Sequence, residues 1–184
     1  MLKKTLCFLT LLFLIGCGSS KKRTHSNSKP KPIVVSVDGS AEEVAPPKIS
    51  KKEEKKNEKA KAIISTALTF SGTRYKFGGT TSKGMDCSGL VFVALKENEI
   101  LFPRVSYQMA EEGKRIKLTQ VQKGDLLFFK TSKRGKRINH VGLVVDVKGT
   151  DIKFIHSTTS RGVIVSSLRE GYWNHAFIKA TRIL

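Results

Sequence analysis

The sequence predicts an α+β domain in which N-terminal helices pack on an antiparallel β-sheet. Two observations support this fold class. Apolar residues recur at helical spacing between about residues 60 and 98, and short β-rich runs follow one another from residue 125 to the C-terminus. Helices that precede a series of strands are typical of α+β folds, because antiparallel neighbours need only short turns.

The first expected helix begins at Ala60 and ends at Gly72, where a glycine-rich loop over residues 72–84 follows. A second, buried helix is expected to begin near Cys87 and to end around Asn98. The apolar residues that predict the two helices are Ala60, Ile63, Ile64, Ala67 and Leu68, then Leu90, Val91, Val93, Ala94 and Leu95.

Five strands are expected after these helices, separated by turn signals of Gly, Lys and Ser. They span residues 125–129, 140–147, 152–156, 163–166 and 177–183. Their close spacing favours antiparallel hairpins over crossover connections.

The 184-residue chain has 34 Lys+Arg against 15 Asp+Glu, a formal net charge of +19, and 39% of its residues are hydrophobic. This length fits one domain with extensions and excludes a large multidomain protein. Residues 61–184 hold 21 basic and 9 acidic residues, a net charge of +12, so the excess lies mainly in the predicted domain. Such a charge favours an anionic partner, whether nucleic acid, an acidic membrane surface or an anionic polymer outside the cell.

Residues 1–16 are interpreted as a lipoprotein signal peptide. Lys3 and Lys4 precede an apolar run of 11 residues over 5–15, too short for the roughly 20 residues of a membrane-spanning helix. The run ends in Leu-Ile-Gly-Cys, which resembles the bacterial lipobox, so lipid attachment is expected at Cys17. In the alternative interpretation, Cys17 is a small residue near an ordinary cleavage site.

Residues 17–59 are expected to form a lipid-anchored flexible linker, because they are rich in Ser, Lys, Glu and Pro and poor in large apolar residues. The last part of this linker can join the helix that follows. Its lysine runs are interpreted as solvated, without a ligand of their own. The folded domain is then expected to span residues 60–184.

Cys87 is the thiol that remains in the predicted mature chain, because Cys7 leaves with the signal peptide and Cys17 carries lipid. A single thiol excludes an intrachain disulfide. Cys87 stands where the glycine-rich loop meets the second helix, and the backbone N–H groups of a helix start favour thiolate over thiol. The sequence therefore predicts a nucleophile with a lowered pKa, although a lone buried Cys is more often inert packing.

A base and an orienting group for this nucleophile are expected on two neighbouring strands. His140 opens one strand and His156 ends the next, so the two rings could lie on one face of the sheet. On chemistry alone, a His at a strand end is often a structural hydrogen-bond partner. The sequence has no paired ligands at CxxC or HExxH spacing, so neither a metal nor another cofactor is expected.

Six motifs, in this order, resemble the NlpC-type family of cell-wall cysteine peptidases. They are GTRYKFGG at residues 72–79, DCSGLV at 86–91, PRVS at 103–106, GDLLFF at 124–129, HVGLV at 140–144, and His156. The tail over residues 157–173 is similar to the Spr-like branch of single-domain outer-membrane lipoproteins. The resemblance covers roughly residues 60–184. It implies that these residues form a catalytic domain with a papain-like α+β fold.

The resemblance also implies a Cys-His-His triad. Cys87 would attack the scissile carbonyl, His140 would take and return the proton, and His156 would hold the His140 ring in its productive tautomer. The backbone N–H of Cys87 and the Tyr75 hydroxyl are the expected oxyanion donors. For Tyr75, a packing role beside the glycine turn is the alternative.

Four further residues near these motifs are expected to bind substrate: Asp86, Ser88, Arg104 and Ser106. The alternatives are a helix cap for Asp86 and a structural loop contact for Arg104 and Ser106. A basic insert over residues 130–137 could edge the cleft, although a solvated hairpin loop is the favoured interpretation.

The expected function is that of a peptidoglycan (murein) endopeptidase that hydrolyses stem-peptide or cross-link bonds involving diaminopimelate during wall remodelling. Its expected partners are peptidoglycan peptides and, through lipid on Cys17, the outer membrane, on the side that faces the periplasm. We expect a monomer and no nucleic acid, because the lipobox places the chain outside the cytoplasm. The alternative is a non-catalytic peptidoglycan-binding envelope lipoprotein.

Overall fold

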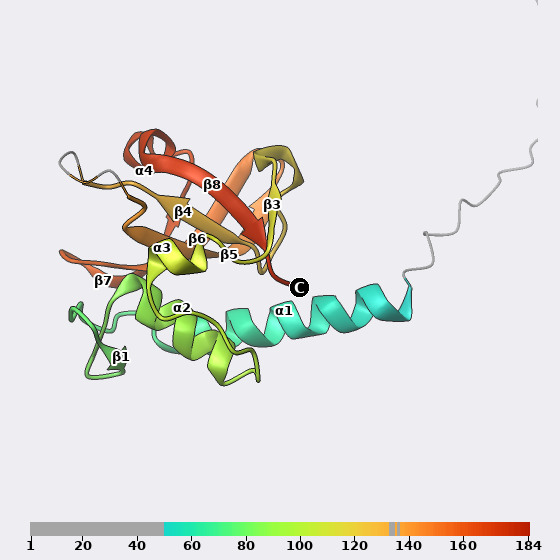
Figure 1. Cartoon of the computed structure of the whole chain (residues 1–184), viewed down its shortest axis with the longest axis horizontal. Helices are drawn as coiled ribbons and strands as arrows, with labels where there is room; N and C mark the ends of the chain where they lie inside the picture. The colour runs from blue at the N-terminus through green and yellow to red at the C-terminus, as the bar shows by residue number, and fades with distance from the viewer. Residues whose placement is uncertain (1–49, 133–134, 136) are drawn as a thin grey trace, which may run out of the picture. The chain divides into compact units, whose positions relative to one another are not determined.

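A six-stranded antiparallel sheet, in the order β3-β8-β4-β5-β6-β7, forms the centre of the fold (Figure 1). The computed structural model describes residues 50–132, 135 and 137–184, which belong to one unit. The predicted signal peptide, Cys17, the linker up to residue 49 and part of the basic insert lie outside these residues. The strands are β3 (Lys114–Ile116), β4 (Leu126–Phe129), β5 (His140–Lys148), β6 (Asp151–Thr158), β7 (Gly162–Ser167) and β8 (Phe177–Arg182).

The predicted α+β class is confirmed, and all five predicted strands are present within two residues of their expected bounds. Several short elements were not predicted, because two to six residues are too few to show a periodic pattern. They are the hairpin of β1 (Thr80–Thr81) and β2 (Gly84–Met85), the strand β3, the helices α3 (Ser106–Met109) and α4 (Gly171–Ala176), and a 3-10 turn over Leu118–Gln120.

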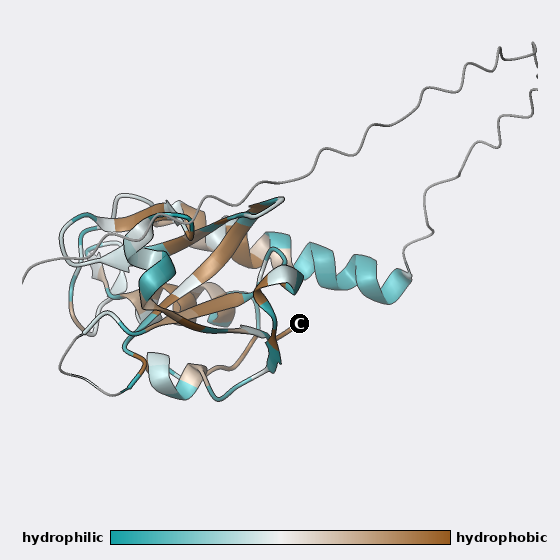
Figure 2. Cartoon of the chain, turned by 90° about the horizontal axis from the view of Figure 1, so that it is seen from above, coloured by the Kyte–Doolittle hydropathy of each residue, from teal (hydrophilic) through white to brown (hydrophobic). Residues whose placement is uncertain are grey.

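The two long helices, α1 (Lys51–Thr69) and α2 (Cys87–Lys96), lie on the same side of the sheet. α1 begins nine residues earlier than the predicted start at residue 60, so the end of the predicted linker is helical. The reason is a cap, in which the Ser50 hydroxyl accepts a hydrogen bond from the Glu53 N–H at 3.3 Å, with acidic residues in the first turn. Only the second half of α1 buries side chains, and Figure 2 shows the first half as hydrophilic.

Apolar side chains pack against both faces of the sheet. Leu126 and Phe128 of β4 join the core beneath α1 and α2, whereas Leu127 and Phe129 join a second core that includes Trp173 of α4. A central strand with two covered faces explains why this run of four apolar residues is buried throughout. Each such side chain contributes about 1.5–3 kcal/mol when it is fully buried.

β5 and β6 form a hairpin whose register shifts by one residue at a β-bulge between Val144 and Asp146. Side chains alternate between the two faces, so the register set by the turn alone would place His140 and His156 on opposite faces. The bulge inserts one extra residue into β5 and thereby brings both histidines to the face of Phe154. The placement of the two histidines on one face therefore depends on this irregularity.

Candidate active site

Cys87 is the first residue of α2 and is 8% exposed. The preceding Asp86 caps the helix, because its Oδ1 accepts a hydrogen bond from the Gly89 N–H at 2.6 Å. A glycine is required at position 89, since a Cβ there would collide with the carbonyl oxygen of Gly79. The loop and the helix start thus approach closely enough to fix the position of the thiol.

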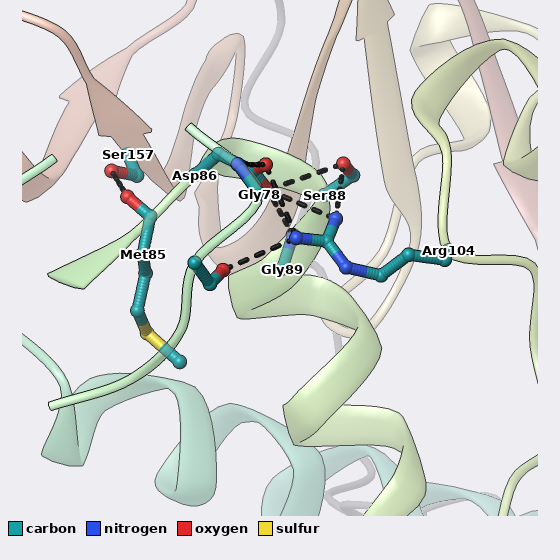
Figure 3. A network of polar contacts seen from close by, with 8 residues as sticks. Gly78, Met85, Asp86, Ser88, Gly89, Arg104 and Ser157 are labelled. Atoms are coloured by element: carbon teal, nitrogen blue, oxygen red, sulfur yellow. Dashed lines mark hydrogen bonds and ion pairs between the residues drawn. The ribbon is translucent and has the colours of Figure 1, made fainter. Parts of the chain in front are cut away.

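A charged cluster holds this junction together, and we call it the arginine clamp: Gly78, Gly79, Asp86, Ser88 and Arg104. Figure 3 labels all of these residues except Gly79. The two terminal nitrogens of Arg104 contact the two carboxylate oxygens of Asp86 at 3.0 and 3.1 Å. Arg104 also donates to the Ser88 Oγ at 2.8 Å and to the Gly79 carbonyl at 3.2 Å. The Gly78 N–H donates to the Asp86 Oδ2 at 2.7 Å. Both carboxylate oxygens are therefore engaged within the protein.

All four predicted substrate-binding residues line one pocket together with Cys87. Asp86 also makes the contacts of a helix cap and an ion pair, which was the alternative interpretation. Ser88 is buried, with its hydroxyl bonded to both Asp86 and Arg104.

Two buried histidines and a serine form a second cluster, which we call the histidine relay: His140, His156 and Ser166. The His140 Nε2 lies 2.8 Å from the His156 Nδ1, and the His156 Nε2 lies 3.0 Å from the Ser166 Oγ. The contact with His156 engages the His140 Nε2, so the Nδ1 is the ring nitrogen that remains for Cys87. Cys87 lines the same pocket as His140. Ser166 was not predicted from the sequence.

Aromatic rings cover the histidine relay. Trp173 stacks on the His140 ring, with centroids 5.1 Å apart and an interplanar angle of 21°. The same indole meets the His156 ring edge-on at 4.5 Å, and Phe154 packs against His156 at 4.7 Å. In the sequence, Trp173 was indicated only by the similarity of residues 157–173 to the Spr-like branch. These rings contribute to the burial of the two imidazoles.

Burial keeps both imidazoles neutral. It lowers the pKa of His140 to about 4, and burial, the His140 charge and the nearby Arg161 lower the pKa of His156 to about 2. Burial also raises the pKa of the Cys87 thiol, although the backbone N–H groups of Val141, Ser88 and Cys87 itself act in the opposite direction. The predicted lowering of the Cys87 pKa is therefore wrong, because the loss of solvent outweighs the helix start.

A neutral thiol beside a neutral imidazole suits general-base chemistry, in which the proton moves as the sulfur attacks. Tyr75 lies close to Cys87. Its backbone forms an isolated β-bridge with Met85, and its side chain lines two pockets that Cys87 also lines. Burial, then the Cys87 and Asp86 charges, raise the pKa of Tyr75, so its hydroxyl stays protonated and can donate. Tyr75 therefore offers a protonated hydroxyl in the pockets that Cys87 lines.

The pockets on the two sides of Cys87 form a candidate substrate site. One includes Phe77, Arg104 and Ser106, and the other includes His140 and the turn over residues 158–161. Space on both sides of the thiol fits a peptide better than a small ligand. Within the described residues, no three His, Cys, Asp or Glu side chains gather as metal ligands would. No helix in the described part of the chain is long and apolar enough to span a membrane.

A thiol at a helix start beside a buried imidazole on an antiparallel sheet defines an α+β protein of the papain-like fold class. The model of the NlpC/P60 family matches residues 72–182. The chain therefore belongs to the NlpC/P60 family, and the predicted family resemblance is confirmed.

Two curated relatives from Escherichia coli strain K12 illustrate the likeness. Murein DD-endopeptidase MepS/Murein LD-carboxypeptidase is 37% identical over 123 residues, which cover 66% of this chain and 62% of that protein. Probable endopeptidase NlpC is 40% identical over 116 residues, which cover 62% of this chain and 72% of that protein. The match thus spans less than two thirds of the length of the MepS relative.

Solved structures show the same fold. An NlpC/P60 family protein from Bacillus cereus ATCC 10987 is similar with a TM-score of 0.61 and 31% identity, over 68% of this chain and 40% of that chain. RipD from Mycobacterium tuberculosis, described as a non-catalytic NlpC/p60 domain protein adapted to peptidoglycan binding, has a TM-score of 0.55 and 24% identity, over 68% of this chain and 98% of its own. The fold alone therefore does not decide between catalysis and binding.

Proposed function

We propose that this protein is a peptidoglycan endopeptidase that cleaves bonds involving diaminopimelate by cysteine catalysis. The observation that carries the proposal is the pocket shared by Cys87 and His140, in which the far nitrogen of His140 is bonded to the buried His156. The relatives named as murein and NlpC endopeptidases support the substrate class. The net charge of the predicted domain suits a carboxylate-bearing polymer.

The proposed reaction begins when the Cys87 sulfur forms a bond with the scissile carbonyl carbon and its proton moves to the His140 Nδ1. The carbonyl oxygen becomes negative and accepts hydrogen bonds from the Cys87 N–H and the Tyr75 hydroxyl. As the C–N bond breaks, His140 returns the proton to the leaving amine. Water, deprotonated by His140, then attacks the acyl-enzyme and releases the thiol and a carboxylic acid.

The surrounding residues have supporting roles in this proposal. Asp86, Ser88, Arg104 and Ser106 contact the stem peptide from their pocket beside Cys87, and Asp86 and Ser88 also hold the loop that carries the thiol. Lipid on Cys17 and the linker after it attach the enzyme, as a monomer, to the periplasmic face of the outer membrane. These attachment residues lie outside the described part of the chain.

Mass spectrometry of purified muropeptides tests the function directly. Wild-type protein is expected to release fragments whose masses identify the cut bond, at D-alanine–diaminopimelate or at D-glutamate–diaminopimelate. Cys87→Ala is expected to release none, and circular dichroism would verify that this variant is folded. Intact muropeptides after incubation with folded wild-type protein, or full activity of Cys87→Ala, would overturn the proposal.

The alternative function is non-catalytic binding of peptidoglycan, which the description of RipD makes a specific possibility for this fold. It predicts that wall sacculi capture the protein and stay uncut. The set of Cys87, His140 and His156 favours catalysis, because binding alone requires neither a nucleophile nor a base. Capture that is equal for wild type and Cys87→Ala, without cleavage by either, would favour the alternative.

A further inference from the structure

His156, the second histidine of the relay, carries a ring hydrogen that needs a hydrogen-bond acceptor. A neutral imidazole has one N–H and one bare nitrogen, whereas a carboxylate in the same place would only accept. The His156 Nδ1 faces His140, and its Nε2 faces the Ser166 Oγ at 3.0 Å. Both His156 and Ser166 are buried, with exposed fractions of 0% and 3%. Within the described residues, Ser166 is the hydrogen-bonding group found at the far end of the relay.

The proton arrangement follows from the task of His140. To take the Cys87 proton, the His140 Nδ1 must be bare, so its own hydrogen sits on Nε2 and is donated to the His156 Nδ1. His156 must then carry its hydrogen on Nε2, and this buried N–H needs an acceptor.

We propose that Ser166 is a positioning residue that stabilises the productive tautomers of both histidines by accepting the hydrogen bond from the His156 Nε2. The inference rests on the proposed cysteine chemistry and adds a fourth member to the triad. The reverse arrangement, with Ser166 donating, places a hydrogen on the His140 Nδ1. In that state His140 cannot take the thiol proton.

The strand pairing explains how Ser166 reaches this position. Ser166 pairs with Phe154 across β6 and β7, so alternation places it on the same face as His156, two residues along β6. The next residue, Ser167, faces the other way and bonds Asp151. Ser167 therefore offers a matched control on the same strand, with the same side chain and a different partner.

Nuclear magnetic resonance of the imidazole nitrogens, by long-range proton–nitrogen correlation in the full chain, reads the tautomers directly. In the wild type, His140 and His156 are both expected as the Nε2–H form. Ser166→Ala is expected to give a mixture of forms at His156, while Ser166→Thr and Ser167→Ala keep the wild-type pattern. An Nδ1–H form of His156 in the wild type, or an unchanged pattern in Ser166→Ala, would overturn the inference.

A double-mutant comparison separates positioning from a purely structural role. Ser166→Ala is expected to lower kcat about tenfold with KM unchanged, the effect of one lost hydrogen bond. In the His156→Ala background the same change is expected to have no effect on kcat. Equal losses in both backgrounds would contradict the inference. If no form cleaved muropeptides, the proposed function would fail, while the nuclear magnetic resonance result would still decide the role of Ser166.

Discussion

The two polar networks beside Cys87 are built on opposite electrostatic principles. The arginine clamp joins formal charges, and its Arg104 side chain is 29% exposed. The histidine relay is neutral, buried and covered by aromatic rings. The clamp holds the backbone that carries Cys87, whereas the relay holds the imidazole proposed as its base.

The largest expected effect comes from removing the base of the relay. His140→Asn is expected to lower kcat for muropeptide cleavage about a thousandfold, because it removes the imidazole proposed to take the Cys87 proton. His175→Asn, at an exposed histidine of α4, provides the control and is expected to behave as wild type. A kcat for His140→Asn within tenfold of wild type would show that the relay is not the proton acceptor.

The neutral relay should also appear in acid stability. The folded pKa of His140, about 4, lies below its ordinary value of 6.5, so the unfolded chain binds the proton first. The neutral His140 contributes about 3 kcal/mol to the unfolding free energy above pH 6.5, and this contribution is lost as the pH falls toward 4. Chemical denaturation at several pH values would measure it. His140→Asn should show a shallower loss, and an identical loss in the variant would contradict a buried neutral His140.

The arginine clamp should respond in stability. Arg104→Met removes the cation that faces Asp86 and is expected to lower the unfolding free energy by about 2 kcal/mol at neutral pH. Arg115→Met, at an exposed position of β3, is the matched control. If both variants unfolded at the same denaturant concentration as wild type, the clamp would not hold the loop.

The smallest expected effect tests the aromatic cover. Trp173→Leu should admit water to the relay and raise the pKa of His140 by about one unit toward its ordinary value. Because the base must be neutral, kcat/KM falls as the pH drops through this pKa, so the acid limb should move upward from about pH 4. A pH profile of kcat/KM measures the shift. An unmoved acid limb would mean that Trp173 does not control the burial of His140.

The sequence was sufficient to predict five of the strands and to select the three residues expected to carry the chemistry. Short apolar runs mark β5 and β6, Cys87 and His140 begin their elements, and His156 lies near the end of β6. The early start of α1 was also readable, since Ser50 and Glu53 have the spacing of a capping box.

Long-range geometry was not readable in the same way. The β-bulge that places His140 and His156 on one face leaves no local mark, and Asp86 and Arg104 meet across 18 residues of chain. The direction of the Cys87 pKa shift depends on burial by segments far away in the sequence. Ser166 could have been found only by counting the alternation of β7 from a known turn register.

The protonation state of Cys87 in the free enzyme tests the contrast between the two networks most directly. Thiolate absorbance in the ultraviolet, recorded against pH as the difference between wild type and Cys87→Ala, would measure it. A neutral pair of Cys87 and His140 predicts that thiolate appears only above the ordinary thiol pKa of about 8.5. A Cys87 thiolate already present at neutral pH, and lost in His140→Asn, would instead establish a charged pair and contradict the neutral relay.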